Sequence, residues 1–302
     1  MKDKVALITG AYGQLGKCIR KYVKEQGEIN GTKFLFASHE EFDITDMSSM
    51  ERYLYIHDDI NIIVNCAAYT NVDRAQNDPV SAFTVNSKGV YNLVKLCEEH
   101  DIMLYHISTD HVYGGEGIYN EESECKPVNI YGQSKRDGEL HIINSELKDW
   151  YIFRTSWLYS EFPGNFFTDI AEIPEEAAVD IICDEIGNPT YAGTLAYYIY
   201  ELITYNICIP SGIYNVSGVG SCSKCDFAQH IKANTYYITG TTAVVHPIMA
   251  KSFKNRAPRP KINIMDNTKF MENSIFFMRP WRYQLTDCIY NYNNSRHERK
   301  LS

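Results

Sequence analysis

The stretch Gly10-Ala-Tyr-Gly13-Gln-Leu-Gly16 directly follows a short apolar run, Val5-Ala-Leu-Ile8, near the start of the chain. Glycines at this spacing let the chain turn tightly, bring backbone N–H groups up to a phosphate and pack the next helix close to the strand. They predict the first strand, turn and helix of a dinucleotide-binding fold. The spacing differs from the G-x-G-x-x-G of many dehydrogenases, and a turn that binds nothing is the alternative.

Mainly apolar runs alternate with segments of helical period through the first half of the chain. The predicted strands are 5–8, 34–37, 60–65, 103–108 and 151–155. The predicted helices are 15–26, 47–56, 79–100, 130–144, 190–203 and one from about 281. This alternation predicts an α/β fold with a doubly wound parallel sheet of Rossmann type.

The carboxyl ends of these strands are where such a sheet binds its ligands. We therefore expect the residues at four strand ends to line one crevice: Thr9-Gly10, Asn65-Cys66-Ala67-Ala68, Ser108-Thr109 and Thr155-Ser156-Trp157.

After Trp157 the regular alternation fails, and from Gly212 onward the chain is predicted to be rich in loops. We expect an NAD(P)-binding Rossmann domain over residues 1–160, which segments at about 178–210 rejoin. Residues 161–302 are expected to form mainly a smaller C-terminal substrate-binding lobe.

Composition restricts the classes of partner. The chain has 302 residues, 44% of them apolar and 22% charged, which predicts a folded protein with a sizeable core. A net charge of −9 argues against nucleic acid, and no apolar run approaches the ~18 residues of a membrane span. Nine scattered cysteines and the absence of a signal-peptide pattern predict reduced thiols in a cytoplasmic protein.

Cys222-x-x-Cys225, with His230 nearby, is the one pair with metal-ligand spacing. A zinc site needs a fourth ligand at recognisable spacing, and the sequence has no second Cys-x-x-Cys. We therefore expect no metal site.

The motif Tyr131-Gly-Gln-Ser-Lys135 places a phenol and an amine on one face of a predicted helix. Carbonyl reduction by a nicotinamide needs a hydride at carbon and a proton at oxygen. Tyr131 is the expected proton donor, and Lys135 the cation that favours its ionised form and holds the nicotinamide ribose. Thr109, or as second choice Ser108, is expected to hydrogen-bond the carbonyl oxygen. An aromatic–lysine surface pair is the alternative.

The end of the second strand usually decides between NAD and NADP. Here Ala37-Ser38-His-Glu-Glu places no carboxylate directly after the strand, and no arginine that would hold a 2′-phosphate. The cofactor, NADP or NAD, therefore stays open. Asp43-Ile44 is expected beside the adenine, with a turn role for Asp43 as the alternative.

Two further polar residues each have two possible roles. Asn86 lies within the predicted helix 79–100, where it either orders a water behind Lys135 or caps a local kink. His111 either contacts substrate or makes an ordinary hydrogen bond within its loop.

These motifs resemble extended short-chain dehydrogenase/reductases and, within them, the dTDP-4-dehydrorhamnose reductase family. The resemblance runs over nearly the whole chain in the expected order and includes segments 10–16, 43–46, 64–73, 106–110, 131–135, 154–157, 165–166, 187–190 and 259–260. It implies NAD(P)H-dependent reduction of the 4-keto group of a nucleotide-linked 6-deoxy sugar, with dTDP-4-dehydrorhamnose converted to dTDP-rhamnose for surface polysaccharide. It also implies Thr109, Tyr131 and Lys135 as the catalytic set.

Motifs and resemblance together assign the expected site residues. The expected cofactor-binding residues are Gly10, Tyr12, Gly13, Gln14, Leu15, Gly16, Ser38, Asp43, Ile44, Cys66, Ala67, Ala68, Tyr69, Asn86, Tyr131 and Lys135. The expected substrate-binding residues are Thr70, Val72, Ser108, His111, Trp157, Asn165 and Arg259.

Three positions depart from the family pattern. His111 stands where the family usually has a tyrosine, Gln76 where it has a glutamate, and segment 169–176, ordinarily a basic helix, is acidic and contains a proline. An acidic strip repels a diphosphate, so the sugar, the nucleotide and the product stereochemistry stay open, as does a homodimer. We expect this segment to face solvent, which leaves Arg259 to meet the phosphates.

Two other functions remain open. One is a non-catalytic NADP-binding regulatory subunit like that of methionine adenosyltransferase, although this chain retains Thr109, Tyr131 and Lys135 together. The other is a sugar-nucleotide epimerase or dehydratase on the same scaffold. A dehydratase would want two adjacent acids after Thr109, and here Asp110 is followed by His111.

Overall fold

Six parallel strands form the central sheet of the computed structural model, which describes residues 4–174, 177–240, 244–252 and 256–301. In spatial order they are β11 (Gly212–Asn215), β6 (Trp150–Thr155), β4 (Met103–Thr109), β3 (Ile62–Asn65), β1 (Lys4–Thr9) and β2 (Thr32–Phe36). The chain passes from β1 outward to β2 and then crosses to β3 on the other side of β1. Ligands of open α/β sheets bind at such a reversal of strand order.

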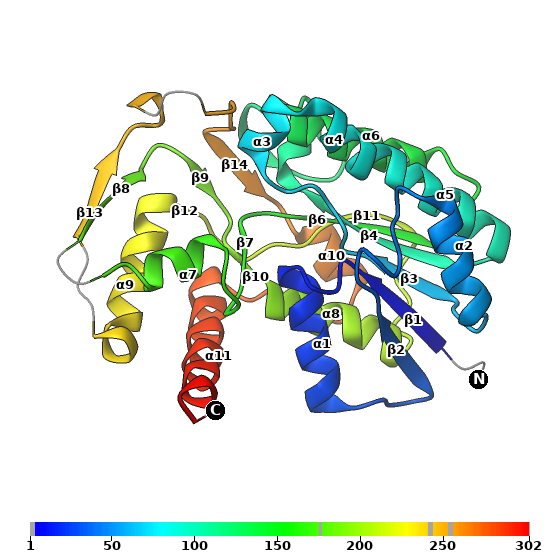
Figure 1. Cartoon of the computed structure of the whole chain (residues 1–302). Coiled ribbons are helices and arrows are strands. Elements are labelled where there is room, and N and C mark those ends of the chain that lie inside the picture. The colour runs from blue at the N-terminus through cyan, green and yellow to red at the C-terminus, as the bar shows by residue number, and fades with distance from the viewer. Residues whose placement is uncertain (1–3, 175–176, 241–243, 253–255, 302) are drawn as a thin grey trace.

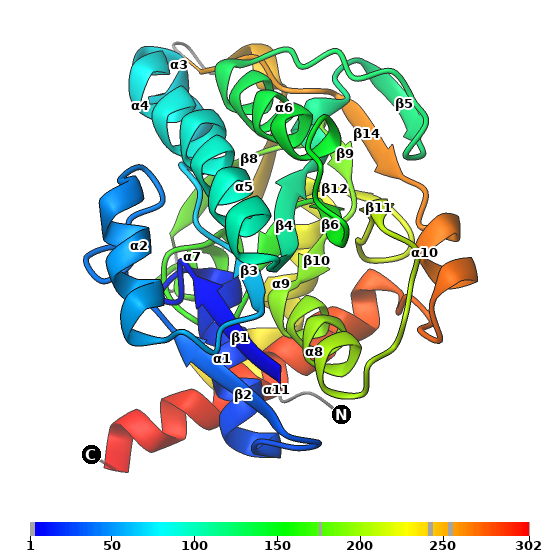
Figure 2. The same ribbon diagram turned by 90° about the vertical axis from the view of Figure 1, so that its right-hand side faces the viewer.

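Helices cover both faces of this sheet. Figures 1 and 2 show α1 and α8 on one face, with α2, α5 and α6 on the other. Their bounds are α1 (Gln14–Gln26), α2 (Met47–Ile56), α5 (Gly89–His100), α6 (Ile130–Ile143) and α8 (Ala192–Thr204). Because both faces are buried, the middle of a strand such as β1 is apolar: Ile8 packs towards α1, and Leu7 towards α2 and α5. The predicted doubly wound α/β fold is confirmed.

A third apolar core is separate from the two beside the sheet, and its helices α7, α9 and α11 lie towards the left of Figure 1. Tyr159, Phe167, Phe227 and Trp281 are among its buried members. Its surrounding elements are β7 (Leu158–Tyr159), α7 (Phe166–Ala171), β8 (Ala178–Ile182), β10 (Thr190–Tyr191), α9 (Lys224–Thr239), β13 (Val244–Ile248) and α11 (Trp281–Leu301).

A second, four-stranded sheet has the order β12-β9-β14-β5. Its strands are β5 (Glu116–Tyr119), β9 (Ile186–Gly187), β12 (Cys222–Ser223) and β14 (Ile262–Met265). The remaining elements are α3 (Val72–Asn77), α4 (Pro79–Phe83), η1 (Thr84–Lys88), η2 (Asp110–Val112), η3 (Ala250–Ser252) and α10 (Thr268–Asn273). Among the described residues, no helix is long and apolar enough to cross a bilayer.

Local pattern located the helices of the first half closely. The predicted helix 47–56 coincides with α2, and 15–26 and 130–144 each differ from α1 and α6 by one residue at one end. The predicted helix 79–100 is divided, because the π-helical turn η1 separates α4 from α5. Asn86 lies in that turn, which is the kind of local irregularity that the kink interpretation anticipated.

The expectation of a loop-rich chain after Gly212 is wrong. This part contains the sixth strand of the main sheet, β11, and the sixteen-residue helix α9. The four residues of β11 have no sequence period of their own and are a strand because they pair with β6. The start of α9 did carry a signal: Ser223 and Asp226 form a capping box, each side chain bonding the other's backbone N–H.

A buried ion pair joins the sheet to α6. Arg154 in β6 donates two hydrogen bonds to the carboxylate of Glu139 in α6, at 2.9 and 2.7 Å, and both side chains are at most 1% exposed. Ser108 in β4 donates a third, at 2.6 Å, and Arg136 a fourth, at 2.8 Å. Burial alone would raise the pKa of Glu139, but the charge and hydrogen bonds of Arg154 lower it. The carboxylate therefore ties β4 and β6 to α6.

We expect Arg154→Met to lower the free energy of unfolding by about 3 kcal/mol or more, because it leaves a buried carboxylate short of its main partner. Urea denaturation of the variant measures this. Lys148→Met is the matched control, because Lys148 pairs with Asp101 at the surface, where an ion pair adds little. Equal denaturation midpoints for the two variants would contradict the proposed role of the buried pair.

Candidate active site

A crevice of about 880 Å³ opens beyond the carboxyl ends of β1, β3, β4 and β6. Every expected cofactor-binding residue except Asn86 lines it, as does every expected substrate-binding residue except Arg259. Thr109 lines it as well. The expectation that Thr9, Asn65 and Ser156 line the crevice is wrong, because all three are buried.

The glycine turn shapes the end of the crevice at α1. A Cβ atom at Gly10, where φ is +60°, would lie 2.7 Å from Ala67 N, and one at Gly16 would lie 2.6 Å from Ala11 Cα. Only glycine permits this close approach of β1, α1 and the loop after β3. The N-cap of α1 is Gly13, and no side chain caps the helix. The first backbone N–H groups of α1 thus begin at the crevice, as a pyrophosphate site requires.

Tyr131 and Thr109 both line the crevice. Thr109 ends β4 and Tyr131 lies in the first turn of α6, close enough that Thr109 influences the pKa of the phenol. Burial raises the pKa of Tyr131 to about 12, Thr109 opposes this and Asp110 adds to it. The phenol therefore keeps its proton at neutral pH, which suits a proton donor.

Ser108 is already committed elsewhere, because its hydroxyl donates to Glu139. Thr109 donates to the Asp110 carboxylate at 3.1 Å and accepts from the backbone N–H of His111 at 3.2 Å. Asp110, which sequence reasoning did not place in the site, is buried, and its other carboxylate oxygen accepts from Ser156. Of the two candidate residues, Thr109 is the one beside Tyr131.

Lys135 is fully buried and turned towards β4. Its Nζ donates to the backbone oxygen of Ile107 at 2.7 Å and lies 3.1 Å from His106 Nε2. Burial lowers the pKa of Lys135 to about 8, although Glu139 and Cys66 act in the opposite direction. Lys135 is not among the groups that shift the pKa of Tyr131 in the free protein.

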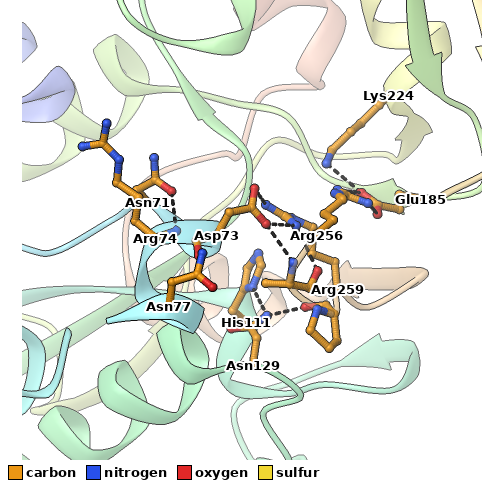
Figure 3. Close-up of polar contacts among 12 residues, drawn as sticks. Asn71, Asp73, Arg74, Asn77, His111, Asn129, Glu185, Lys224, Arg256 and Arg259 are labelled. Atoms are coloured by element: carbon orange, nitrogen blue, oxygen red, sulfur yellow. Dashed lines mark hydrogen bonds and ion pairs between the residues drawn. The ribbon is translucent and has the colours of Figure 1, made fainter. Parts of the chain in front are cut away.

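His111, one of the three departures from the family pattern, lies edge to face with the Tyr131 ring, and the ring centroids are 5.4 Å apart. Asn129, the N-cap of α6, accepts from Gly132 N through Oδ1, so its Nδ2 must donate to His111 Nδ1, 3.0 Å away, and to Pro258 O (Figure 3). Burial lowers the pKa of His111. The neutral ring therefore carries its proton on Nε2.

A smaller cavity of about 240 Å³ adjoins the crevice, and Asp110, His111 and Trp157 line both. Lys224 and Arg259 also line it, each paired with a carboxylate (Figure 3). Arg259 donates to both oxygens of Asp73, which lowers the pKa of that carboxyl.

The carboxylate of Glu185 accepts hydrogen bonds from both Lys224 and Arg256. Burial alone would raise the pKa of Glu185, but these partners lower it to about 2. The predicted site residue Arg259 thus lies beside the crevice. Sequence reasoning missed the cations Lys224 and Arg256, which come from α9 and from the segment before β14.

Three other expected residues have structural partners of their own. Asn86 does not line the crevice. Its side chain accepts from Tyr69 N and donates to Tyr69 O and to Ser134 Oγ, and so connects the loop after β3 to α6. Asp43 lines the crevice and also accepts from Thr45 N and Oγ1, as a turn residue does. Asn165 lines the crevice and caps α7.

The acidic segment 169–176 is only partly described. Asp169 and Glu172 are exposed and line neither cavity, while residues 175–176, including Glu175, fall outside the described residues. Cys222 and Cys225 are buried free thiols. No group of three or more His, Cys, Asp or Glu positioned to hold a metal occurs in the described ranges.

The fold also brings an arginine to the end of β2 that sequence reasoning did not place there. Arg20 of α1 lies over the ring of Tyr12, 4.5 Å from its centroid, and over Phe36 at 5.0 Å. Its Nε is buried without a hydrogen-bond partner in the described structure. The nearby Ser38 backbone N–H donates to Glu41. The guanidinium thus lies beside the crevice wall formed by Tyr12 and Ser38.

The described geometry has close counterparts among known proteins. The chain is 31% identical over 288 residues to a dTDP-4-dehydrorhamnose reductase of Mycolicibacterium smegmatis, covering 94% of this chain and 84% of the relative. It is 32% identical to the spore coat polysaccharide biosynthesis protein SpsK of Bacillus subtilis, covering 94% and 96%.

Among solved structures, the dTDP-4-dehydrorhamnose reductase of Bacillus anthracis in complex with NADP superimposes with a TM-score of 0.84 at 31% identity, covering 96% of this chain and 99% of that one. The family model of the RmlD substrate binding domain matches residues 4–294. Because this model matches nearly the whole chain, the chain belongs to the RmlD family of extended short-chain dehydrogenase/reductases.

Proposed function

We propose that the protein is an NADPH-dependent reductase that converts the 4-keto group of dTDP-4-dehydrorhamnose to the alcohol of dTDP-rhamnose, a precursor of surface polysaccharide. The observation that carries the proposal is that Thr109, Tyr131 and Lys135 line one crevice with the glycine turn, and that a cavity with two cations adjoins it. The named relatives that reduce dTDP-linked 4-keto sugars support it.

Each catalytic residue has a role that its surroundings permit. When bound, the nicotinamide dinucleotide would supply the hydride. The protonated phenol of Tyr131 delivers the proton to the carbonyl oxygen, and Thr109 hydrogen-bonds the same oxygen. His111 offers its Nε2 proton to the sugar from the side of Tyr131. Lys135 reaches the nicotinamide ribose from α6.

The smaller cavity is suited to the nucleotide diphosphate. Lys224 and Arg259 supply the charge-assisted donors that a diphosphate requires, although Glu185 and Asp73 already hold them in place. Trp157, Phe166 and Phe227 supply apolar surface in the same cavity. A ligand that enters therefore finds preformed cations and shares them with two carboxylates.

We further propose that the chain divides as its cores do. Residues 1–160 with α8 and β11 would form the dinucleotide-binding domain, because both later elements pack on or pair with the main sheet. The third core, built from α7, α9 and α11, would be the substrate lobe. The active site then lies between the two.

Replacing Tyr131 tests the proposed reaction. We expect Tyr131→Phe to lower turnover by about 100-fold or more, because the proton donor is lost while the ring still packs. NADPH affinity, measured by fluorescence titration, should barely change, because the glycine turn remains. Lys135→Met should lower both, since Lys135 is proposed to hold the ribose.

Tyr91→Phe is the matched control, because Tyr91 lies exposed on α5, away from the crevice, and its loss should leave turnover unchanged. Equal, small effects of Tyr131→Phe and Tyr91→Phe would refute the proposed role of Tyr131.

Arg20 is proposed to favour NADPH over NADH by pairing with the 2′-phosphate. We expect Arg20→Ala to weaken NADPH binding by about 10-fold and to leave NADH binding nearly unchanged, because only NADPH carries that phosphate. Calorimetric titration with both dinucleotides measures this. Lys24→Ala removes an exposed charge from the last turn of the same helix and should change neither affinity. A parallel loss for NADPH and NADH in Arg20→Ala would exclude a 2′-phosphate contact.

A further inference from the structure

His106 is a buried histidine in the middle of β4, and neither the motifs nor the proposed reaction assigns it a role. It is 0% exposed, and both ring nitrogens face nitrogen atoms. Nδ1 lies 3.0 Å from the side-chain nitrogen of Asn65, and Nε2 lies 3.1 Å from Lys135 Nζ. The position of the imidazole proton therefore decides what Lys135 can do.

The side-chain amide of Asn65 has one permitted orientation. Its Oδ1 accepts from the backbone N–H of Ala67 at 3.1 Å and from Thr9 Oγ1 at 2.8 Å. A backbone N–H can only donate, so the atom that faces it must be the oxygen. The amide nitrogen of Asn65 therefore points at His106 and donates to Nδ1.

The donor at Asn65 fixes the tautomer of His106. Burial is the main influence that lowers the pKa of His106 well below its ordinary value, so the ring is neutral. Because Nδ1 accepts, the single proton of a neutral ring is on Nε2, facing Lys135.

A charged Lys135 has no lone pair to accept from this N–H, whereas a neutral amine accepts it and still donates to Ile107 O. We propose that Thr9, Asn65 and His106 form a chain of hydrogen-bond donors that ends on Lys135 and favours its neutral amine in the free protein. Above the pH at which Lys135 titrates, it then takes a proton from solvent when the negatively charged dinucleotide enters the crevice. His106 is a positioning residue, because it acts through Lys135.

The other titratable groups near Lys135 do not explain a neutral amine. Glu139, one turn along α6, is a carboxylate and favours the charged form, as does Cys66 from the loop after β3. Burial raises the pKa of the Cys66 thiol to about 12. Tyr131, one turn back along α6, keeps its proton. Burial lowers the pKa of Lys135, and we infer that His106 lowers it as well.

The test separates those two influences in the full chain without dinucleotide. Long-range ¹H–¹⁵N spectra report the histidine tautomer directly, and we expect His106 as the Nε2–H form. The ¹³Cε signal of Lys135, assigned by its loss in Lys135→Met, should titrate near pH 8. In His106→Gln the N–H of the imidazole is replaced by an amide whose oxygen accepts from an ammonium, so the pKa of Lys135 should rise towards its ordinary 10.5.

Asn65→Asp gives a second, independent readout. A carboxylate can only accept from Nδ1, so His106 should change to the Nδ1–H tautomer, and Lys135 should again titrate higher. His106 as the Nδ1–H form in the unaltered protein would overturn the proposal. So would a Lys135 titration that is the same with and without the His106→Gln change, because burial alone would then set it.

Binding of NADPH completes the test. Calorimetry at pH 8.5 in two buffers of different ionisation enthalpy should show net proton uptake in the unaltered protein and less in His106→Gln. Equal uptake in both would count against His106. If NADPH did not bind at all, the proposed function would fail, while the tautomer and the Lys135 titration of the free protein would still decide this inference.

Discussion

The carboxylate of Glu139 holds together the parts of the protein on which the site depends. It lies fully buried in α6, one turn beyond Lys135, and receives Ser108 from β4 and Arg154 from β6. Thr109 is the next residue after Ser108, and Tyr131 lies on the same helix as Glu139. The buried ion pair therefore holds the strand that ends in Thr109 against the helix that carries Tyr131. Such a pair costs desolvation, which its full set of hydrogen bonds offsets.

The same region shows how backbone N–H groups orient side chains that carry protons. Ala67 N fixes the amide of Asn65, and Gly132 N fixes that of Asn129. Each amide then donates to the Nδ1 atom of a histidine, His106 below the site and His111 beside Tyr131. Two neutral imidazoles are thereby held with their protons on Nε2. Preorganised donors of this kind need no rearrangement when charge develops on a bound ligand.

The sequence was sufficient for the features that local pattern decides. Apolar runs located five of the six strands of the main sheet, and the glycine turn and the Tyr131–Lys135 spacing located the crevice. The sixth strand, β11, could not be found because it is a strand only through pairing with β6. The helical period continues across the π-turn, so only the kink interpretation of Asn86 pointed to an irregularity there.

Charged residues that meet only through tertiary packing were also beyond the sequence. Arg20 reaches the end of β2 from α1, and Lys224 reaches the cavity from α9, more than a hundred residues after His111. The two omissions have different consequences. The missed strand changes no site residue, whereas these cations are the ones proposed to select the dinucleotide and the nucleotide sugar. Corrections to the site therefore concern selectivity more than the proposed chemistry.

Consumption of NADPH by the purified protein, followed with dTDP-4-dehydrorhamnose and in parallel with UDP- and GDP-linked 4-keto-6-deoxy sugars, tests the central claim most directly. The account predicts rapid oxidation of NADPH with the dTDP sugar and formation of dTDP-rhamnose. Tight binding of NADPH with no oxidation in the presence of any of these sugars would contradict it, and would identify the protein as a non-catalytic dinucleotide-binding subunit.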